Sequence, residues 1–167
     1  MSHKKHLWAP WKMEYIKNKD ASQKIFSSKP NETEDKGNFI LYRGESCYII
    51  MNYYPYNNGH LMIVPYEESD SVENLADETL TEIMRLTKKT MKILRENLQC
   101  HGFNFGANIG AAAGAGIEEH IHFHIVPRWA GDTNFMPVLG HTKVEVQGLQ
   151  ECYDLLRPHF DCIKIDK

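Results

Sequence analysis

Between residues 77 and 98, apolar residues recur at a spacing of three or four positions. This period places them on one stripe of an α-helix. Lysine and arginine side chains lie mostly on the other faces. The spacing predicts a helix over residues 77–98, whose buried stripe consists of Leu80, Ile83, Met84, Thr87, Met91, Leu94 and Leu98.

Shorter runs elsewhere alternate apolar and polar side chains, which is typical of β-strands. They predict strands over residues 39–43, 47–52, 60–65, 103–109 and 120–126. Several strands with one long helix between them indicate an α+β fold with an antiparallel sheet.

The two ends of the chain have a different pattern. Residues 7–19 are amphipathic and predict a short helix after Pro10, while residues 20–38 indicate a loop. Residues 149–160 predict a C-terminal helix that is interrupted near Pro158. A chain of 167 residues fits one domain. We expect this domain to contain a partly loop-like segment (1–38), a catalytic core (39–130) and a C-terminal extension (131–167) that is mostly irregular over residues 131–147.

The last predicted strand, 120–126, carries three histidines at alternate positions. Successive side chains of a strand point to opposite faces, so His120, His122 and His124 share one face. The residues between them are apolar and are expected to face the core. The residues alone leave three interpretations open: a solvated strand surface, a zinc site with a further ligand elsewhere, and attack by an imidazole on phosphorus.

Residues 110–117 lead into this strand and consist almost only of glycine and alanine. Ligand oxygens can approach the backbone N–H groups of such a loop closely, because few side chains intervene. By itself this composition is a weak sign of phosphate binding. The position of the loop directly before the three histidines makes a phosphate site a stronger hypothesis.

Composition and charge restrict the possible functions. The net charge of -3 argues against a large basic surface for nucleic acid. Apolar runs are too short for a membrane span, and the first residues lack the apolar core of a signal peptide. The four cysteines contain no Cys-x-x-Cys pair and suggest reduced thiols of a cytoplasmic protein.

Two longer motifs resemble a known family. Residues 120–126, His-Ile-His-Phe-His-Ile-Val, match the pattern His-φ-His-φ-His-φ-φ at every position, where φ is apolar. Residues 52–65 form a second block that contains Gly59-His60. With these motifs the chain resembles the histidine triad (HIT) family of nucleotide-binding proteins. Residues 7–16 and 127–135 make it similar to the bacterial branch that contains diadenosine tetraphosphate (Ap4A) phosphorylases. The resemblance implies a HIT-like fold and a homodimer with a shared sheet.

The resemblance also implies a mechanism. His122 would attack the α-phosphorus of a dinucleoside polyphosphate and form a nucleotidyl-histidine. His124 and the fourth active-site histidine, His60, would orient it, and His120 would contact the phosphates or the leaving group. Inorganic phosphate would then release ADP, whereas water would release AMP. We therefore expect an adenine nucleotide as the substrate and inorganic phosphate as the second reactant. We expect the protein to bind neither nucleic acid nor a membrane.

Other residues match positions that contact nucleotide in the family. Asn52 stands eight residues before His60, where the family has a ribose-contacting Asp or Asn. Asn108 matches an amide that points at the phosphates. Arg128 is either a surface charge or a phosphate contact, and Trp129 is expected near the nucleotide or the dimer interface. The remaining candidates are backbone N–H groups at Gly114 and Gly116, with Lys143 as a weak further one.

Two departures from the family change these expectations. Lys24, Ser27 and Glu68 replace the Cys, Cys and His that many members of this branch use to bind zinc. Three lost ligands predict that the chain has no structural zinc and no cofactor. The segment Gly114-Ala115-Gly116 replaces the Gly-Gln-[Ser/Thr] of known hydrolases, which favours the phosphorylase branch.

Three alternatives to an Ap4A phosphorylase stay open. One is a HIT hydrolase of dinucleoside polyphosphates or nucleoside phosphoramidates. Another is a nucleotide-binding protein with little turnover, and the third is a metalloenzyme.

Overall fold

The computed structural model describes residues 25–31, 33–132 and 147–163. The expected helix within residues 7–19, Lys24, Lys143 and residues 133–146 and 164–167 of the C-terminal extension lie outside these ranges. The described elements, in chain order, are α2 (Ile25–Ser28), η1 (Lys29–Asn31), β1 (Ile40–Arg43), β2 (Cys47–Met51), β3 (Leu61–Pro65), η2 (Val72–Asn74), α3 (Asp77–Leu98), β4 (Gly102–Ala107), η3 (Ala111–Ala113), β5 (Phe123–Arg128) and α5 (Leu149–Phe160).

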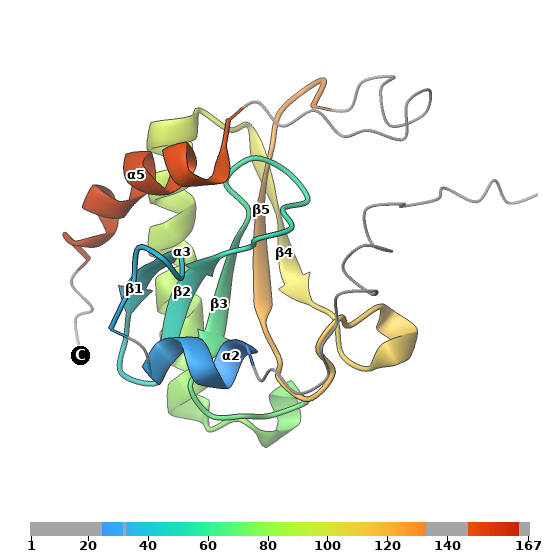
Figure 1. Ribbon diagram of the computed structural model, residues 1–167. Coiled ribbons are helices and arrows are strands. Elements are labelled where there is room, and N and C mark those ends of the chain that lie inside the picture. Colours follow the sequence, from blue (N-terminus) through green and yellow to red (C-terminus); the bar gives the residue numbers. More distant parts are fainter. Residues whose placement is uncertain (1–24, 32, 133–146, 164–167) are drawn as a thin grey trace, which may run out of the picture.

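The five strands form one antiparallel sheet in the order β1-β2-β3-β5-β4. The first three strands follow each other as a meander, whereas β5 inserts between β3 and β4 (Figure 1). Met62 of β3 pairs with His124 of β5, so two segments 62 positions apart in the sequence meet at the middle of the sheet. The α+β fold with an antiparallel sheet is therefore confirmed.

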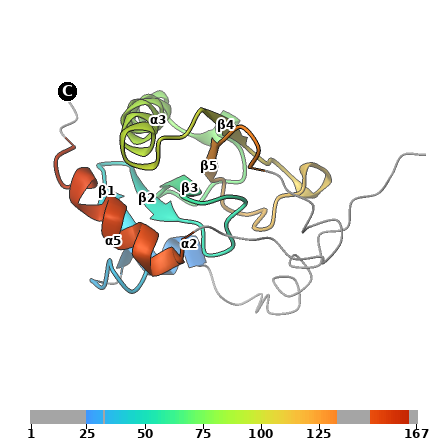
Figure 2. The same ribbon diagram turned by 90° about the horizontal axis from the view of Figure 1, so that it is seen from above.

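The sheet separates two apolar clusters. Helix α3 lies on one face and the short helix α2 on the other, while α5 packs against β1 and α3 (Figures 1 and 2). The larger cluster, on the α3 side, includes the three apolar residues between the histidines, as expected: Ile121, Phe123 and Ile125. The smaller cluster, on the α2 side, comprises Phe26, Ile40, Tyr48, Ile50, Met62 and Val64.

Helix α3 begins and ends where the spacing predicts, at Asp77 and Leu98. Its buried face differs from the expected stripe, because Met84 is exposed while Leu86 and Thr90 are fully buried. The helix also buries a carboxylate, that of Glu82. Met84 lies on the flank of the stripe, where neighbouring segments decide burial and the helical period does not.

Three other expectations need correction. The strand predicted over residues 120–126 begins only at Phe123 and continues to Arg128, through Pro127. Proline has no backbone N–H to donate within a sheet. Pro127 is tolerated because β3 pairs only with the first half of β5 and needs no hydrogen bond from residue 127. Residues 20–38 are not entirely loop, since α2 and η1 lie in them. Helix α5 is not broken at Pro158, because only the last turn follows that proline.

Strand β4 is an outer strand of the sheet and ends at Ala107, two residues earlier than predicted. Phe105, on its length, and Ile109, just beyond it, are exposed. An exposed edge with apolar side chains is compatible with pairing to another chain. The homodimer stays a prediction.

None of the helices in the described part of the chain is long and apolar enough to cross a membrane. All four cysteines lie in the described ranges and are free thiols, as expected; Cys47, Cys100 and Cys152 are buried.

The buried carboxylate of Glu82 joins α3 to the turn between β1 and β2. It accepts the backbone N–H groups of Glu45 at 2.8 Å and Ser46 at 2.7 Å. Gly44 makes this approach possible, because a Cβ there would lie 2.3 Å from the Glu82 Oε1 and 2.7 Å from the Cys47 carbonyl oxygen. One side chain therefore fixes the first hairpin against the long helix.

Replacing Glu82 tests this anchor. Glu82→Ala removes the acceptor of two charge-assisted hydrogen bonds and is expected to lower the free energy of unfolding by about 2 to 4 kcal/mol. Glu82→Gln keeps one acceptor oxygen, so its free energy of unfolding should lie between those of Glu82→Ala and the wild type. Urea denaturation measures the loss, with the exposed Glu96→Ala as the matched control. An effect of Glu82→Ala no larger than that of Glu96→Ala would contradict the assignment.

Candidate active site

The four histidines of the predicted site come together beside the start of β5. His124 lies in β5, His120 and His122 precede it, and His60 directly precedes β3. Their exposed fractions are 8%, 2%, 7% and 1% in that order. The interpretation as a solvated strand surface is therefore wrong. A buried polar cluster requires each ring nitrogen to have a partner or a function.

His122 has a defined tautomer. Its Nδ1 lies 2.9 Å from the carbonyl oxygen of His120, which can only accept a hydrogen bond. Nδ1 therefore carries the proton in the neutral ring, and Nε2 keeps its lone pair. Burial lowers the pKa of His122, and the charge of a protonated His120 would lower it further, against the opposing effect of the backbone hydrogen bond. The imidazole is thus held neutral, with Nε2 as a nucleophile.

His60 and His124 form a hydrogen-bonded relay with fixed direction. The backbone N–H of Tyr56 donates to Nδ1 of His60 at 3.0 Å, so the proton of a neutral His60 is on Nε2. That Nε2 lies 2.9 Å from Nδ1 of His124 and donates to it. Neutral His124 therefore carries its proton on Nε2.

The Nε2–H of His124 is the end of this relay. It is buried and has no hydrogen-bond partner in the part of the chain that the structure describes. The His124 ring is 4.8 Å from the His122 ring, centre to centre. Burial, and secondarily the charge of a protonated His122, lower the pKa of His124 to about 4. The site thus places one nucleophilic nitrogen and one unpartnered N–H donor on neighbouring rings.

Asn52 flanks the relay. Its Oδ1 accepts the backbone N–H of Tyr54 at 2.9 Å, and its Nδ2 is 3.3 Å from Nδ1 of His60. The amide thus borders His60. Contact with a ribose stays a prediction.

His120 is held by partners from two directions. Its Nε2 donates to the carbonyl oxygen of Pro65, at the end of β3, at 2.8 Å. Its Nδ1 is 3.4 Å from Oγ of Ser27 in α2. Both ring nitrogens therefore face protein atoms. Contact of His120 with phosphates or the leaving group stays a prediction.

The glycine- and alanine-rich loop contains a short turn, η3, which lies beyond the end of β4 at the side of the sheet (Figure 1). Gly110 and Gly114 have positive φ angles of 75° and 87°, which favour glycine. The N–H of Gly114 donates to the carbonyl of Ala111 at 2.9 Å, so it is already used within the turn. Asn108 lies between β4 and this turn, half-buried. Phosphate contacts by Asn108, Gly114 and Gly116 stay predictions.

Arg128 and Trp129 lie at the other end of β5 from the histidines. Arg128 makes a bidentate ion pair with Asp132, at 2.6 and 2.9 Å, and donates to Asn104 at 2.8 Å. The indole N–H of Trp129 donates to the carbonyl of Leu98 at 3.1 Å. The structure does not bring these two residues to the histidine cluster, and their contact with nucleotide stays a prediction.

Some residues near the histidines carried no signal in the sequence. The Phe26 ring of α2 lies 4.9 Å from the His122 ring, and the Tyr56 ring is stacked at 5.6 Å from that of His124. Phe26 comes from a segment without a motif, and Tyr56, although it lies within the block 52–65, was not singled out as a site residue. Only the fold shows that they border the cluster.

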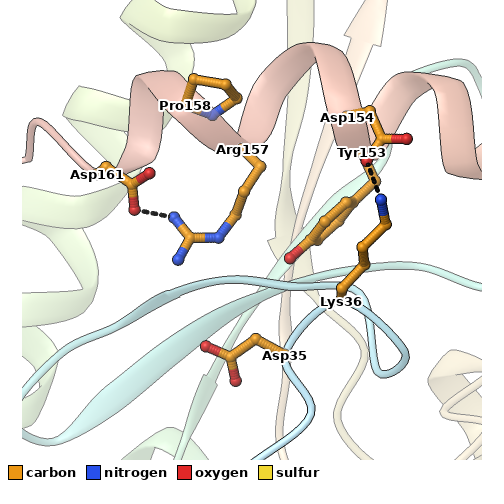
Figure 3. Close-up of a pocket in the computed structure, with 7 residues that line it drawn as sticks. All are labelled: Asp35, Lys36, Tyr153, Asp154, Arg157, Pro158 and Asp161. Atoms are coloured by element: carbon orange, nitrogen blue, oxygen red, sulfur yellow. Dashed lines mark hydrogen bonds and ion pairs between the residues drawn. The ribbon is translucent and has the colours of Figure 1, made fainter.

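A cleft between α5 and the segment before β1 lies apart from the histidines (Figure 3). Its charged side chains pair with one another or with the strand: Lys36 with Asp154 at 3.0 Å, Arg157 with Asp161, and Asp35 with Arg43 at 2.7 Å. None of the residues predicted for the site lines it. These contacts support α5 and suggest no reaction chemistry.

Metal chemistry was another interpretation of the histidines. Across residues 25–31, 33–132 and 147–163, no three His, Cys, Asp or Glu side chains are grouped so that they could hold a metal ion. The absence of a metal or other cofactor stays a prediction.

Comparison with known proteins agrees with this geometry. The HIT domain family model matches residues 33–131. AP-4-A phosphorylase of Mycobacterium tuberculosis is 38% identical over 159 residues, covering 90% of this chain and 81% of the relative. Adenosine 5'-monophosphoramidase of Candida albicans is 29% identical over 94 residues, covering 54% and 61%.

The fold has a similar counterpart among solved structures. A zinc-bound histidine triad family protein from Mycobacterium smegmatis superposes with a TM-score of 0.61 at 25% identity, covering 74% of this chain and 84% of that one. The family model spans more than half of the chain, and the mycobacterial phosphorylase is similar along most of its length. On this evidence the chain belongs to the HIT family.

Proposed function

We propose that this HIT-family enzyme, which acts on nucleotides, cleaves Ap4A by phosphorolysis to ADP and ATP. The observation that carries the proposal is that two neighbouring buried rings hold a lone pair on Nε2 of His122 and an unpartnered N–H on Nε2 of His124. The 38% identity to AP-4-A phosphorylase of Mycobacterium tuberculosis supports the choice of substrate.

The first step is attack by Nε2 of His122 on the α-phosphorus. A bond forms between this nitrogen and phosphorus, the bond from phosphorus to the bridging oxygen breaks, and ATP leaves. Because Nδ1–H donates to the His120 carbonyl, the ring is already oriented and can share the positive charge that develops on it. The product of this step is AMP bound covalently to His122.

His124 stabilises the charge on the phosphoryl oxygens. Its Nε2–H is the donor that the relay from Tyr56 through His60 leaves unused. A donor fixed before the substrate binds needs no reorganisation during the reaction, which is how electrostatic stabilisation lowers a barrier. His60 thus acts on the substrate only through His124.

In the second step an oxygen of inorganic phosphate attacks the same phosphorus. The bond to His122 breaks, the lone pair returns to Nε2, and ADP leaves. Attack by water in place of phosphate gives AMP. The histidines serve both acceptors equally, so the choice depends on whether phosphate is bound near the intermediate.

Hydrolysis is the second candidate function. The 29% identity to adenosine 5'-monophosphoramidase of Candida albicans favours it, because a hydrolase of this type also needs a nucleophilic histidine and a donor to the phosphate. Such a hydrolase would also begin with attack by Nε2 of His122 on the α-phosphorus, but a different leaving group would depart. The nature of the acceptor separates the two functions.

Product analysis with Ap4A distinguishes these functions. The proposal predicts ADP and ATP only when inorganic phosphate is present, as separated by ion-exchange chromatography. His122→Asn removes the nucleophile and should lower turnover by about a thousandfold or more. The exposed His159→Asn, on α5, is the matched control and should retain full activity. AMP and ATP at a rate independent of phosphate would instead identify a hydrolase, and tight AMP binding without products would identify a binding protein.

The pH dependence of kcat/KM tests the neutral state of the cluster. Protonation of His122 removes its nucleophilic lone pair, and its pKa is lowered from the ordinary 6.5. We therefore expect kcat/KM for Ap4A, at saturating phosphate, to stay level from pH 8 to about 6.5 and to fall only below that. His159→Asn should leave this profile unchanged. A midpoint of the acid limb at pH 6.5 or above would refute the proposed burial effect.

A further inference from the structure

A short polar path connects α2 to the first histidine of the triad. The Ser27 hydroxyl lies 3.2 Å from Oε2 of Glu68, the residue three positions after β3, and 3.4 Å from Nδ1 of His120. Because Nε2–H of His120 donates to the carbonyl of Pro65, Nδ1 of the neutral ring is an acceptor, so the one Ser27 proton goes either to Glu68 or to His120. His120 is therefore fixed between α2 and the end of β3.

The path continues to the nucleophile. The carbonyl of His120 accepts Nδ1–H of His122, so a shift of His120 moves the acceptor that sets the His122 tautomer. The neighbour of Ser27, Phe26, is buried against both rings, at 5.7 Å from His120 and 4.9 Å from His122. Its carbonyl accepts the hydroxyl of Tyr48 at 2.9 Å, which holds α2 on the sheet.

The residues at this place do not fit a structural zinc ion. Such sites use four thiolate, imidazole or carboxylate donors in a tetrahedron. Among the described residues, Ser27 offers a neutral hydroxyl, and the two ring nitrogens of His120 already face Ser27 and Pro65. Glu68 alone adds one suitable donor, so the set is incomplete.

We propose that Ser27 and Glu68 are positioning residues that hold His120, and through its carbonyl the nucleophile His122, without a metal ion. Both residues replace ligands that the zinc-binding branch carries at these positions. A hydrogen-bonded contact between α2 and the residues after β3 thus takes over the role of joining these segments. The kinetic part of this inference rests on the proposed function, whereas the structural part does not.

The kinetic test uses variants that differ by one contact. Ser27→Ala removes the hydroxyl, whereas Ser27→Thr keeps it and should therefore keep kcat near the wild-type value. Glu68→Ala removes the carboxylate, with Glu67→Ala, its exposed neighbour, as the matched control. We expect Ser27→Ala and Glu68→Ala to lower kcat about tenfold with KM changed less than twofold, as for residues that orient a catalytic group. Ser27→Thr and Glu67→Ala should stay within twofold of the wild type.

A second test needs no turnover. In long-range ¹H–¹⁵N NMR spectra, the His122 Nδ1–H should give a slowly exchanging signal in the wild type. We expect it to be lost to rapid exchange in Ser27→Ala and Glu68→Ala, and retained in Ser27→Thr and Glu67→Ala. Addition of EDTA should leave the signal and the melting temperature of the wild type unchanged.

Two results would overturn the inference. If Ser27→Ala only lowers the melting temperature while kcat and the Nδ1–H signal stay unchanged, the contact is merely structural. If the purified protein holds stoichiometric zinc and EDTA abolishes the Nδ1–H signal, a metal ion holds the site. If the wild type turns over neither Ap4A nor adenosine phosphoramidate, the proposed function fails, and the NMR test still decides the positioning role.

Discussion

The direction of the hydrogen bonds among the buried histidines determines what this molecule can do. The backbone N–H of Tyr56 faces His60, and the backbone carbonyl of His120 faces His122. Together they allow only one protonation pattern for the neutral rings. His60 must donate to His124, and His122 must keep its lone pair on Nε2. Burial disfavours added protons and thereby keeps this pattern near neutral pH. The chemistry therefore follows from main-chain positions as much as from the histidines.

The sheet supplies these main-chain positions. Insertion of β5 between β3 and β4 places His124 opposite Met62, two residues beyond His60, so the His60 and His124 rings meet. The α2 side of the sheet then covers the cluster, through Phe26 and its neighbours. The long helix on the other face only supports this arrangement, anchored by apolar contacts and by Glu82. The two faces thus have separate tasks: one stabilises the fold and the other contains the site.

Local patterns were sufficient to predict much of this fold. The 3.6-residue period predicted α3 at its correct bounds, and the alternation predicted all five strands, with β5 shifted. The motif indicated which four histidines meet. Their tautomers were beyond prediction, because these depend on the N–H of Tyr56 and on the geometry around His120. The interactions of Arg128 were also unpredictable, since a charged side chain at a strand end shows no preference between phosphate and the nearby Asp132.

Trapping the covalent intermediate tests the central claim most directly. Wild-type protein is mixed with Ap4A without phosphate, quenched within milliseconds in alkaline denaturant, digested and analysed by mass spectrometry. The account predicts a single AMP group on His122, which disappears when phosphate is added before the quench and is absent from His122→Asn. An AMP group on another residue, or full turnover with no covalent AMP at any time, would contradict it.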